Sequence, residues 1–247
     1  MRLTVIGCGD AFGSGGRFNT CFLIQGASST ILLDCGASSM VALHAGAVDL
    51  AAIDAVVISH LHGDHFGGLP FFLLDAHFLT RRDKPLLIAG PPGTRNRLSA
   101  AMEVFFAGSA ATKWRFGLQV DEIAVGSHHQ LLGYDLRTTE VVHQSGAPST
   151  AVRVSEGHHV LSYSGDSEWT DALYDVADGA DLFIVECYDF KRRLAGHMSW
   201  LDLQPRLPLL NARRIMLTHM NPSMLEQQDT LRQAGVLLAE DGLVYEF

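Results

Sequence analysis

Apolar positions recur along the chain with two different periods. In the first ninety residues, short apolar and β-branched runs are bounded by glycine, serine and aspartate, which is the pattern of β-strands. These runs predict strands at 3–7, 20–25, 30–34, 55–58 and 86–89. Apolar positions three and four residues apart predict helices at 37–46, 69–79 and 94–106.

The rest of the chain first contains mainly strands, and afterwards helices and strands alternate. Residues 118–164 contain short strands separated by turns. Beyond them, the pattern predicts helices at about 168–178, 199–209 and 223–234, strands at 182–185 and 214–217, and two closing strand-like segments. This order fits two β-sheets covered by helices, a four-layer α/β sandwich.

Composition narrows the class of protein. Of the 247 residues, 47% are apolar and 18% are charged, so one domain spanning 1–247 can bury a large core. The net charge of −9 argues against binding of long RNA or DNA, which needs many lysine and arginine contacts to phosphate.

Two further features indicate the compartment. The apolar run around 69–79 is broken by Asp75 and His77, and the first residues contain no apolar leader, so we expect a cytoplasmic protein without membrane contact. Four isolated cysteines are expected to be small buried residues of a reducing compartment: Cys8, Cys21, Cys35 and Cys187.

A glycine-rich stretch at 7–16 follows the first strand. Its spacing does not match a dinucleotide-binding loop, and it leads into a strand where a helix would be required. We interpret it as a loop at the rim of a site, with Arg17 and Asn19 as either substrate contacts or ordinary polar loop residues.

The chemistry concentrates in residues 60–65, directly after the strand at 55–58. Side chains alternate along an extended segment, so His60 and His62 point the same way and can hold one cation. Asp64 and His65 lie on the next turn and face a second position. Four ligand-type residues within six positions predict a metal site.

This His-x-His-x-Asp-His motif after a strand resembles the signature of the metallo-β-lactamase superfamily. The resemblance implies an αββα sandwich with a two-metal hydrolytic site and further ligands downstream. Strand-like runs end at His143, Asp166 and His219, in the expected order. By resemblance, His60, His62 and His143 hold the first metal, Asp64, His65 and His219 the second, and Asp166 bridges them.

The expected cofactors are two divalent cations, with Zn²⁺ favoured and Mn²⁺ as the alternative. Oxygen-reducing di-iron relatives carry a carboxylate where this chain has His62, so hydrolysis is favoured over redox chemistry. Two such cations lower the pKa of a shared water from about 15.7 towards about 7, and Asp64 can hold the resulting hydroxide.

Glu186 and His197 bear on which bond is cut. A Gly-His-x-Ser pattern at 196–199, with a glutamate shortly upstream, resembles the phosphodiesterase branch that contains ribonuclease Z. There the histidine contacts the phosphate or protonates the leaving oxygen, and the glutamate orients it. The resemblance implies a hydrolase of small phosphodiesters, such as cyclic nucleotides or cyclic sugar phosphates.

One departure argues against processing of tRNA. Ribonuclease Z carries a long arm between its third metal histidine and its bridging aspartate, whereas only residues 144–165 occupy that interval here. The basic run Lys191, Arg192 and Arg193 is either a small phosphate cradle or a solvated turn.

Three alternatives stay open. They are an RNA 3′-end nuclease without the arm, a thioester or lactone hydrolase that uses the metals without Glu186 and His197, and a non-catalytic binding module. A homodimer is expected by resemblance alone.

Overall fold

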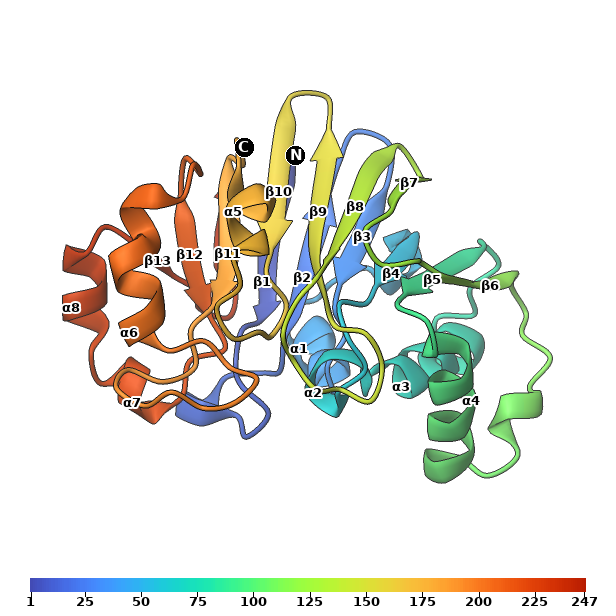
Figure 1. Ribbon diagram of the computed structural model, residues 1–247. Helices are drawn as coiled ribbons and strands as arrows, with labels where there is room; N and C mark the ends of the chain where they lie inside the picture. Colours follow the sequence, from blue (N-terminus) through green and yellow to red (C-terminus); the bar gives the residue numbers. More distant parts are fainter.

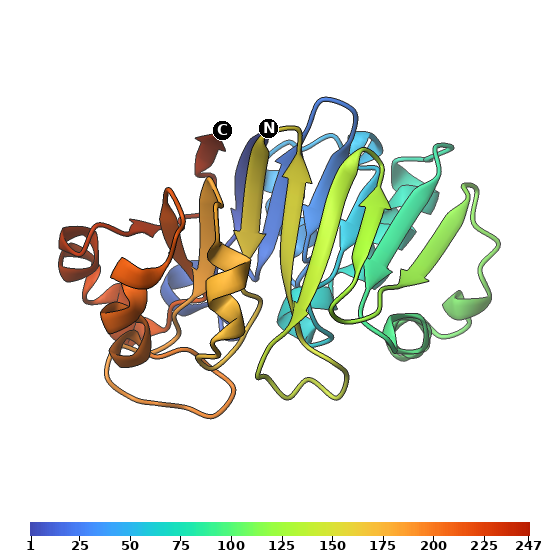
Figure 2. The ribbon, with the colours of Figure 1, turned by 45° about the horizontal axis from the view of Figure 1, so that its top comes forward.

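Two seven-stranded β-sheets lie face to face, with helices on their outer faces (Figures 1 and 2). The computed structural model describes residues 1–247. In spatial order, the first sheet contains β14 (Val244–Glu246), β1 (Arg2–Gly7), β2 (Cys21–Gln25), β3 (Thr30–Leu33), β4 (Ala55–Val57), β5 (Leu86–Gly90) and β6 (Leu118–Glu122). The second sheet contains β13 (Leu237–Leu238), β12 (Ile215–Thr218), β11 (Leu182–Glu186), β10 (His159–Tyr163), β9 (Thr150–Glu156), β8 (Tyr134–Glu140) and β7 (His128–Leu131). The predicted αββα sandwich is confirmed.

Helices cover both outer faces. On the first sheet lie α1 (Ser39–Ala45), α2 (Gly63–Phe66), α3 (Leu69–Leu74) with a wider π-helical turn at Asp75–Leu79, and α4 (Thr94–Phe105). On the second lie α5 (Ala172–Ala177), α6 (Trp200–Leu203), α7 (Pro222–Leu225) and α8 (Gln228–Gln233). Short 3₁₀ turns occupy Ser14–Gly16, Leu50–Ala52, Ser109–Ala111 and Gln204–Leu209. None of these helices is long and apolar enough to span a bilayer.

The core forms three apolar layers because each buried strand presents side chains to both of its faces. The layer between the sheets includes Phe22, Leu33 and Tyr163, and the other two lie between each sheet and its helices. The four cysteines are buried and free, as the sequence predicts.

Strand direction decides where the site lies. Strands β3 to β6 run parallel in the first sheet, and β10 to β13 run parallel in the second. Because β8 and β10 both pair antiparallel with β9, β8 runs in the same direction as β10. The carboxyl ends of β8, β10 and β12 therefore meet at one edge of the second sheet.

Three helix predictions differ from the structure. The helix expected at 168–178 begins only at Ala172, because the Glu168 amide donates to the Val142 carbonyl and holds the chain beside the end of β8. The helix expected at 199–209 tightens into a 3₁₀ turn after Leu203, since Pro205 and Pro208 lack amide donors. The helix expected at 223–234 is interrupted at Gln227, where φ is −109° and ψ is 18°.

The two ends of the chain lie side by side. Strand β14 pairs antiparallel with β1, with Arg2 opposite Glu246 and Thr4 opposite Val244. The side chain of Asp241 reaches the same region, where its carboxylate accepts from the amides of Cys8 and Phe18. The first sheet is thus completed by the last strand.

Candidate metal centre

The seven predicted ligands converge at the rim where both sheets end. Residues 60–65 cross this rim after β4, and α2 begins at Gly63. From the second sheet, three residues follow β8, β10 and β12: His143, Asp166 and His219. Their side chains form two groups, one of His60, His62 and His143, the other of Asp64, His65, Asp166 and His219, and within each group the ligand atoms lie within 4.8 Å of one another.

Asp166 lies between the two groups. Its Oδ2 atom is 3.2 Å from His65 Nε2 and 3.3 Å from His219 Nε2. The same oxygen is 3.8 Å from His60 Nε2 and 4.0 Å from His143 Nε2. One carboxylate oxygen therefore faces both groups, as a bridging ligand must.

The histidines are oriented by bonds on the side away from the cluster. The Ser59 hydroxyl donates to Asp34, so the Nδ1 proton of His60 is the donor in its 3.1 Å contact with Ser59 Oγ. His65 Nδ1 lies 2.8 Å from the Asp34 carboxylate, and His143 Nδ1 donates to the Gly196 carbonyl at 2.6 Å. The opposite nitrogens, Nε2 of all three histidines, thus face the cluster.

Two of these nitrogens have no hydrogen-bond partner. Nε2 of His60 and of His65 is buried without a partner, as is Asp166 Oδ1. A buried polar atom without a partner is costly in a folded protein. A divalent cation would satisfy these atoms, so the residues present fit the metals that the motif implies.

Asp34 was not among the predicted site residues. It is fully buried in a left-handed backbone conformation (φ 60°) directly after β3, and it accepts from Ser59 as well as facing His65. A sequence signal existed, because an aspartate ends the apolar run next to the metal-site strand. Asp34 fixes the ring of His65 and hence the direction of Nε2.

Charge in the cluster is balanced by protons when no metal is bound. Burial alone would lower the pKa of His65, but the carboxylates of Asp166 and Asp64 outweigh it and raise that pKa well above its usual range. His219 behaves alike: burial lowers its pKa, Asp166 and Asp64 raise it, and the net value is about 10. Burial, followed by the charge of His65, depresses the pKa of His60. The carboxylates of Asp64 and Asp166 thus favour protonated histidines, and bound metal ions can take the place of these protons.

Glu186 and His197 meet beside the second group. Glu186 Oε1 is 2.5 Å from His197 Nδ1, and its Oε2 accepts from the amides of Ser167 and Met198. Glu186 is fully buried, whereas the His197 side chain is 27% exposed. Burial lowers the pKa of His197, but the hydrogen bond and charge of Glu186 raise it above its usual value. The pair is arranged to present a protonated imidazole, with Nε2 free of partners on the chain.

The loop 188–198 carries this histidine. The Tyr188 ring packs against His197 with centroids 4.9 Å apart, and buried Asp189 accepts from the amides of Lys191 and Arg192. The Gly196 amide donates to Glu168 Oε1 at 2.8 Å, while its carbonyl accepts from His143. One glycine therefore connects a predicted metal ligand to the residue preceding His197.

Several polar residues that the sequence left open are bonded within the chain. The Asn19 side chain bonds to Ser38 and to the Asp10 carbonyl, so it fastens the glycine-rich loop instead of facing a substrate. The Arg192 guanidinium donates to Asp189, and Nε of Arg193 donates to Asp202, so both charges are paired within the chain.

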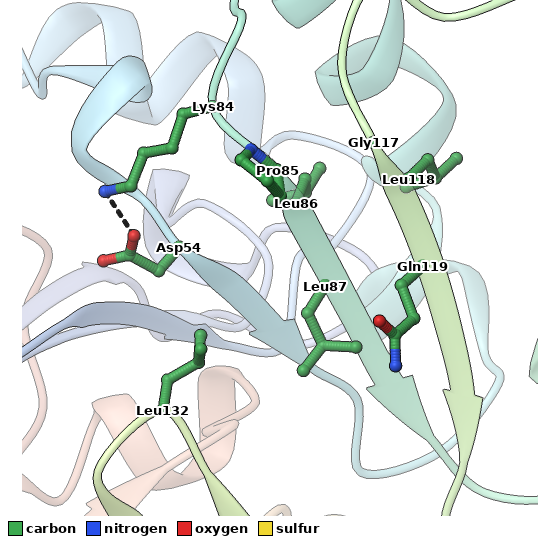
Figure 3. Close-up of a pocket in the computed structure, with 9 residues that line it drawn as sticks. All are labelled: Asp54, Lys84, Pro85, Leu86, Leu87, Gly117, Leu118, Gln119 and Leu132. Atoms are coloured by element: carbon green, nitrogen blue, oxygen red, sulfur yellow. Dashed lines mark ion pairs between the residues drawn. The ribbon is translucent and has the colours of Figure 1, made fainter.

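Two hollows differ in character. One of about 210 Å³ opens at the cluster and is lined by His62, His143, Glu168 and His197. Another of about 470 Å³ lies at the amino-terminal ends of β4, β5 and β6 (Figure 3), where leucines and the Lys84–Asp54 ion pair line it. No histidine lines this second hollow, so the candidate active site is the hollow at the ligand cluster.

Fold and site together define a metallo-hydrolase of the metallo-β-lactamase fold. Over its full length the chain is 28% identical to the probable metallo-hydrolase YhfI of Bacillus subtilis, also over its full length. The crystal structure of YhfI superposes with a TM-score of 0.79 at 25% identity, covering 99% of each chain. A family profile described as "Anti-Pycsar protein Apyc1" matches residues 1–245, and the chain belongs to this family.

Two further structures share the fold. The short form of human tRNase Z gives a TM-score of 0.80 at 24% identity, covering 100% of this chain and 99% of its own. A diphosphatase of the PhnP family gives 0.80 at 22% identity, covering 100% and 97%. Ribonuclease Z of Lachnospira eligens is 24% identical over 78% of this chain and 80% of its own, which confirms the resemblance to ribonuclease Z.

Proposed function

We propose that this protein is a dinuclear, metal-dependent phosphodiesterase that acts on small phosphodiesters, cyclic ones included. The observation that carries the proposal is the Glu186–His197 pair beside the ligand cluster. A thioester hydrolase needs no such acid, because a thiolate is a weak enough base to leave without a proton. Two relatives of the same fold are named a tRNase and a diphosphatase, which agrees with chemistry at phosphorus.

The ligand groups suit two Zn²⁺ ions, because five of the seven donors are imidazoles and imidazole favours zinc over magnesium or calcium. We assign His60, His62 and His143 to one ion, Asp64, His65 and His219 to the other, and Asp166 to both. When bound, the ions would supply Lewis acidity and a water of lowered pKa.

The residues of the chain then have distinct tasks. The Asp64 carboxylate, 3.1 Å from His219 Nε2 and 3.4 Å from His65 Nε2, is placed to accept a proton from the attacking water. On the other side, His197 Nε2 donates its proton to the leaving oxygen as the P–O bond breaks. The charge of Glu186 stabilises the imidazolium before that transfer.

A small substrate fits better than structured RNA. Residues 144–165 form a short loop and the β9–β10 hairpin, so no arm projects from the domain. With a net charge of −9 and with Arg192 and Arg193 paired to aspartates, the rim offers little to a phosphate backbone. Both features argue against the alternative function, an RNA 3′-end nuclease.

The test compares substrates on protein whose metals are quantified. We expect two metals per chain, together with faster hydrolysis of bis(p-nitrophenyl) phosphate than of a p-nitrophenyl ester or a lactone. Two metals with ester or lactone preference would contradict the phosphodiesterase assignment while leaving the metal centre in place.

Replacing Glu168 by alanine should weaken metal binding. The substitution leaves the Gly196 amide without its acceptor, so the carbonyl that holds His143 loses its position. We expect the apparent Zn²⁺ affinity, measured by competition with a chelator, to fall roughly 10–100-fold.

Two variants serve as controls for this prediction. Glu168→Gln retains an acceptor oxygen and should restore most of the affinity, and Glu140→Ala alters an exposed glutamate at the end of β8 and should change nothing. Equal affinity in Glu168→Ala and wild-type protein would show that Gly196 holds its place unaided.

A further inference from the structure

A third hollow shares part of its lining with the hollow at the metal centre. It has a volume of about 500 Å³, within the usual range for a ligand site, and shares Glu168, Ala195 and His197 with the hollow at the cluster. We call it the side hollow. Since His197 lines both spaces, a molecule with its phosphate at the cluster can extend past His197 into the side hollow.

The lining of the side hollow also includes Trp169, Arg193, Asp202 and Arg206. The Arg206 guanidinium carbon lies 4.7 Å from the centroid of the Trp169 ring. The Trp169 ring is held by its own bond to Asp171 and by an edge contact with Tyr174, with centroids 5.1 Å apart. A planar cation is thus supported on an aromatic face.

Asp202 holds both arginines in place. Its carbonyl accepts from Arg206 Nη1 at 2.6 Å, and its carboxylate accepts from Arg193 Nε at 2.9 and 3.1 Å. A guanidinium carries five N–H donors, so each arginine retains donors that the chain itself does not use. None of these four residues has a task in the hydrolysis proposed above.

We propose that the side hollow binds the nucleobase of a nucleotide substrate. A base is planar, carries ring acceptors that match the free guanidinium donors, and stacks on aromatic and guanidinium planes. In this arrangement the Arg206 guanidinium lies between the indole of Trp169 and the base, and Arg193 donates to the edge of the base. The inference rests on the proposed phosphodiesterase function and names the part of the substrate that sets specificity.

The test measures binding and does not require turnover. Isothermal titration of the metal-loaded protein with adenosine 5′-monophosphate and with ribose 5-phosphate, which lacks the base, gives a ratio of dissociation constants. We expect the nucleotide to bind roughly tenfold tighter, about the contribution of one stacked base. Arg206→Ala and Trp169→Leu should reduce this ratio to near one and leave the affinity for ribose 5-phosphate unchanged.

Three further variants test which side chains of the side hollow contribute to binding of the base. Arg206→Lys keeps the charge without the plane and should behave like Arg206→Ala. Arg193→Ala removes a side chain that is 65% exposed, so it should fold normally and still lower the ratio. Arg213→Ala, on a side chain that is 78% exposed and lies outside the side hollow, is the matched control.

The outcomes distinguish the two proposals. Equal affinities for nucleotide and ribose phosphate in the wild-type protein, or a ratio that survives both Arg206→Ala and Trp169→Leu, would overturn the assignment of the side hollow. Failure of the phosphodiesterase proposal would instead appear as absence of diester hydrolysis, whatever the binding ratio.

Discussion

Replacing His197 by alanine will lower kcat for an alkyl phosphodiester by roughly 10²–10⁴-fold, the usual contribution of a general acid, without changing the metal content. The loss should be smaller for bis(p-nitrophenyl) phosphate, because p-nitrophenolate leaves without needing a proton. Comparing the loss of kcat for the two substrates therefore tests whether His197 protonates the leaving group, as well as whether it is needed at all.

The same residue predicts the pH dependence. An acid acts only while protonated, so kcat is lost as the pH rises through the pKa of His197, which Glu186 holds above the usual 6.5. Glu186→Gln removes the charge that raises this pKa, and the alkaline limb of the kcat profile should move to lower pH.

The control for His197 is His158→Ala, at an exposed turn, which should match the wild-type protein. Loss of one metal from His197→Ala would give the residue a different role. Its ring nitrogen does lie near Asp166 and His219, so metal analysis has to accompany the kinetics.

The second large effect is expected from Asp166→Asn. The asparagine keeps the volume of the side chain but removes the negative charge at the junction of both ligand groups. Without metal, His65 and His219 would also lose the carboxylate that favours their protonated forms. We expect metal affinity to fall by more than roughly 100-fold. This is more than the loss expected from removing a residue that acts on a ligand only through hydrogen bonds, such as Glu168.

Metal analysis after dialysis, read together with kcat, checks this expectation. Asp229→Asn, on the exposed face of α8, is the matched control and should retain full metal content. Two tightly held metals in Asp166→Asn would exclude Asp166 as the shared ligand.

The ligand set could be read from the sequence because its members follow buried strands. Runs such as the one before His219 are apolar and short, and the carboxyl ends of parallel strands meet at one edge of a sheet. Among the groups that orient the ligands, Asp34 also ends an apolar run, but the others gave no comparable signal. Glu168 and Gly196 act through single hydrogen bonds whose partners lie far apart in the chain.

The basic run at 191–193 shows what the sequence leaves open. Its charge fits either a phosphate cradle or a solvated turn, because the sequence does not show which carboxylates lie nearby. Asp189 and Asp202 take up two of the three cations, and Asp202 is nine residues from its partner. The pair of Asp189 and Arg192 is local, whereas the pair of Arg193 and Asp202 depends on how the loop 188–198 folds back, which no local pattern encodes.

The pairing of β14 with β1 has a consequence for biosynthesis. As the chain leaves the ribosome, residues 60–65 emerge more than 150 residues before His219 and before β14, the strand that completes the first sheet. The His219 amide donates to the Cys8 carbonyl, so even this contact joins late residues to early ones. A nascent chain that has exposed only the early residues therefore carries part of the ligand set on an unfinished sheet, and the set is complete only after His219 has emerged.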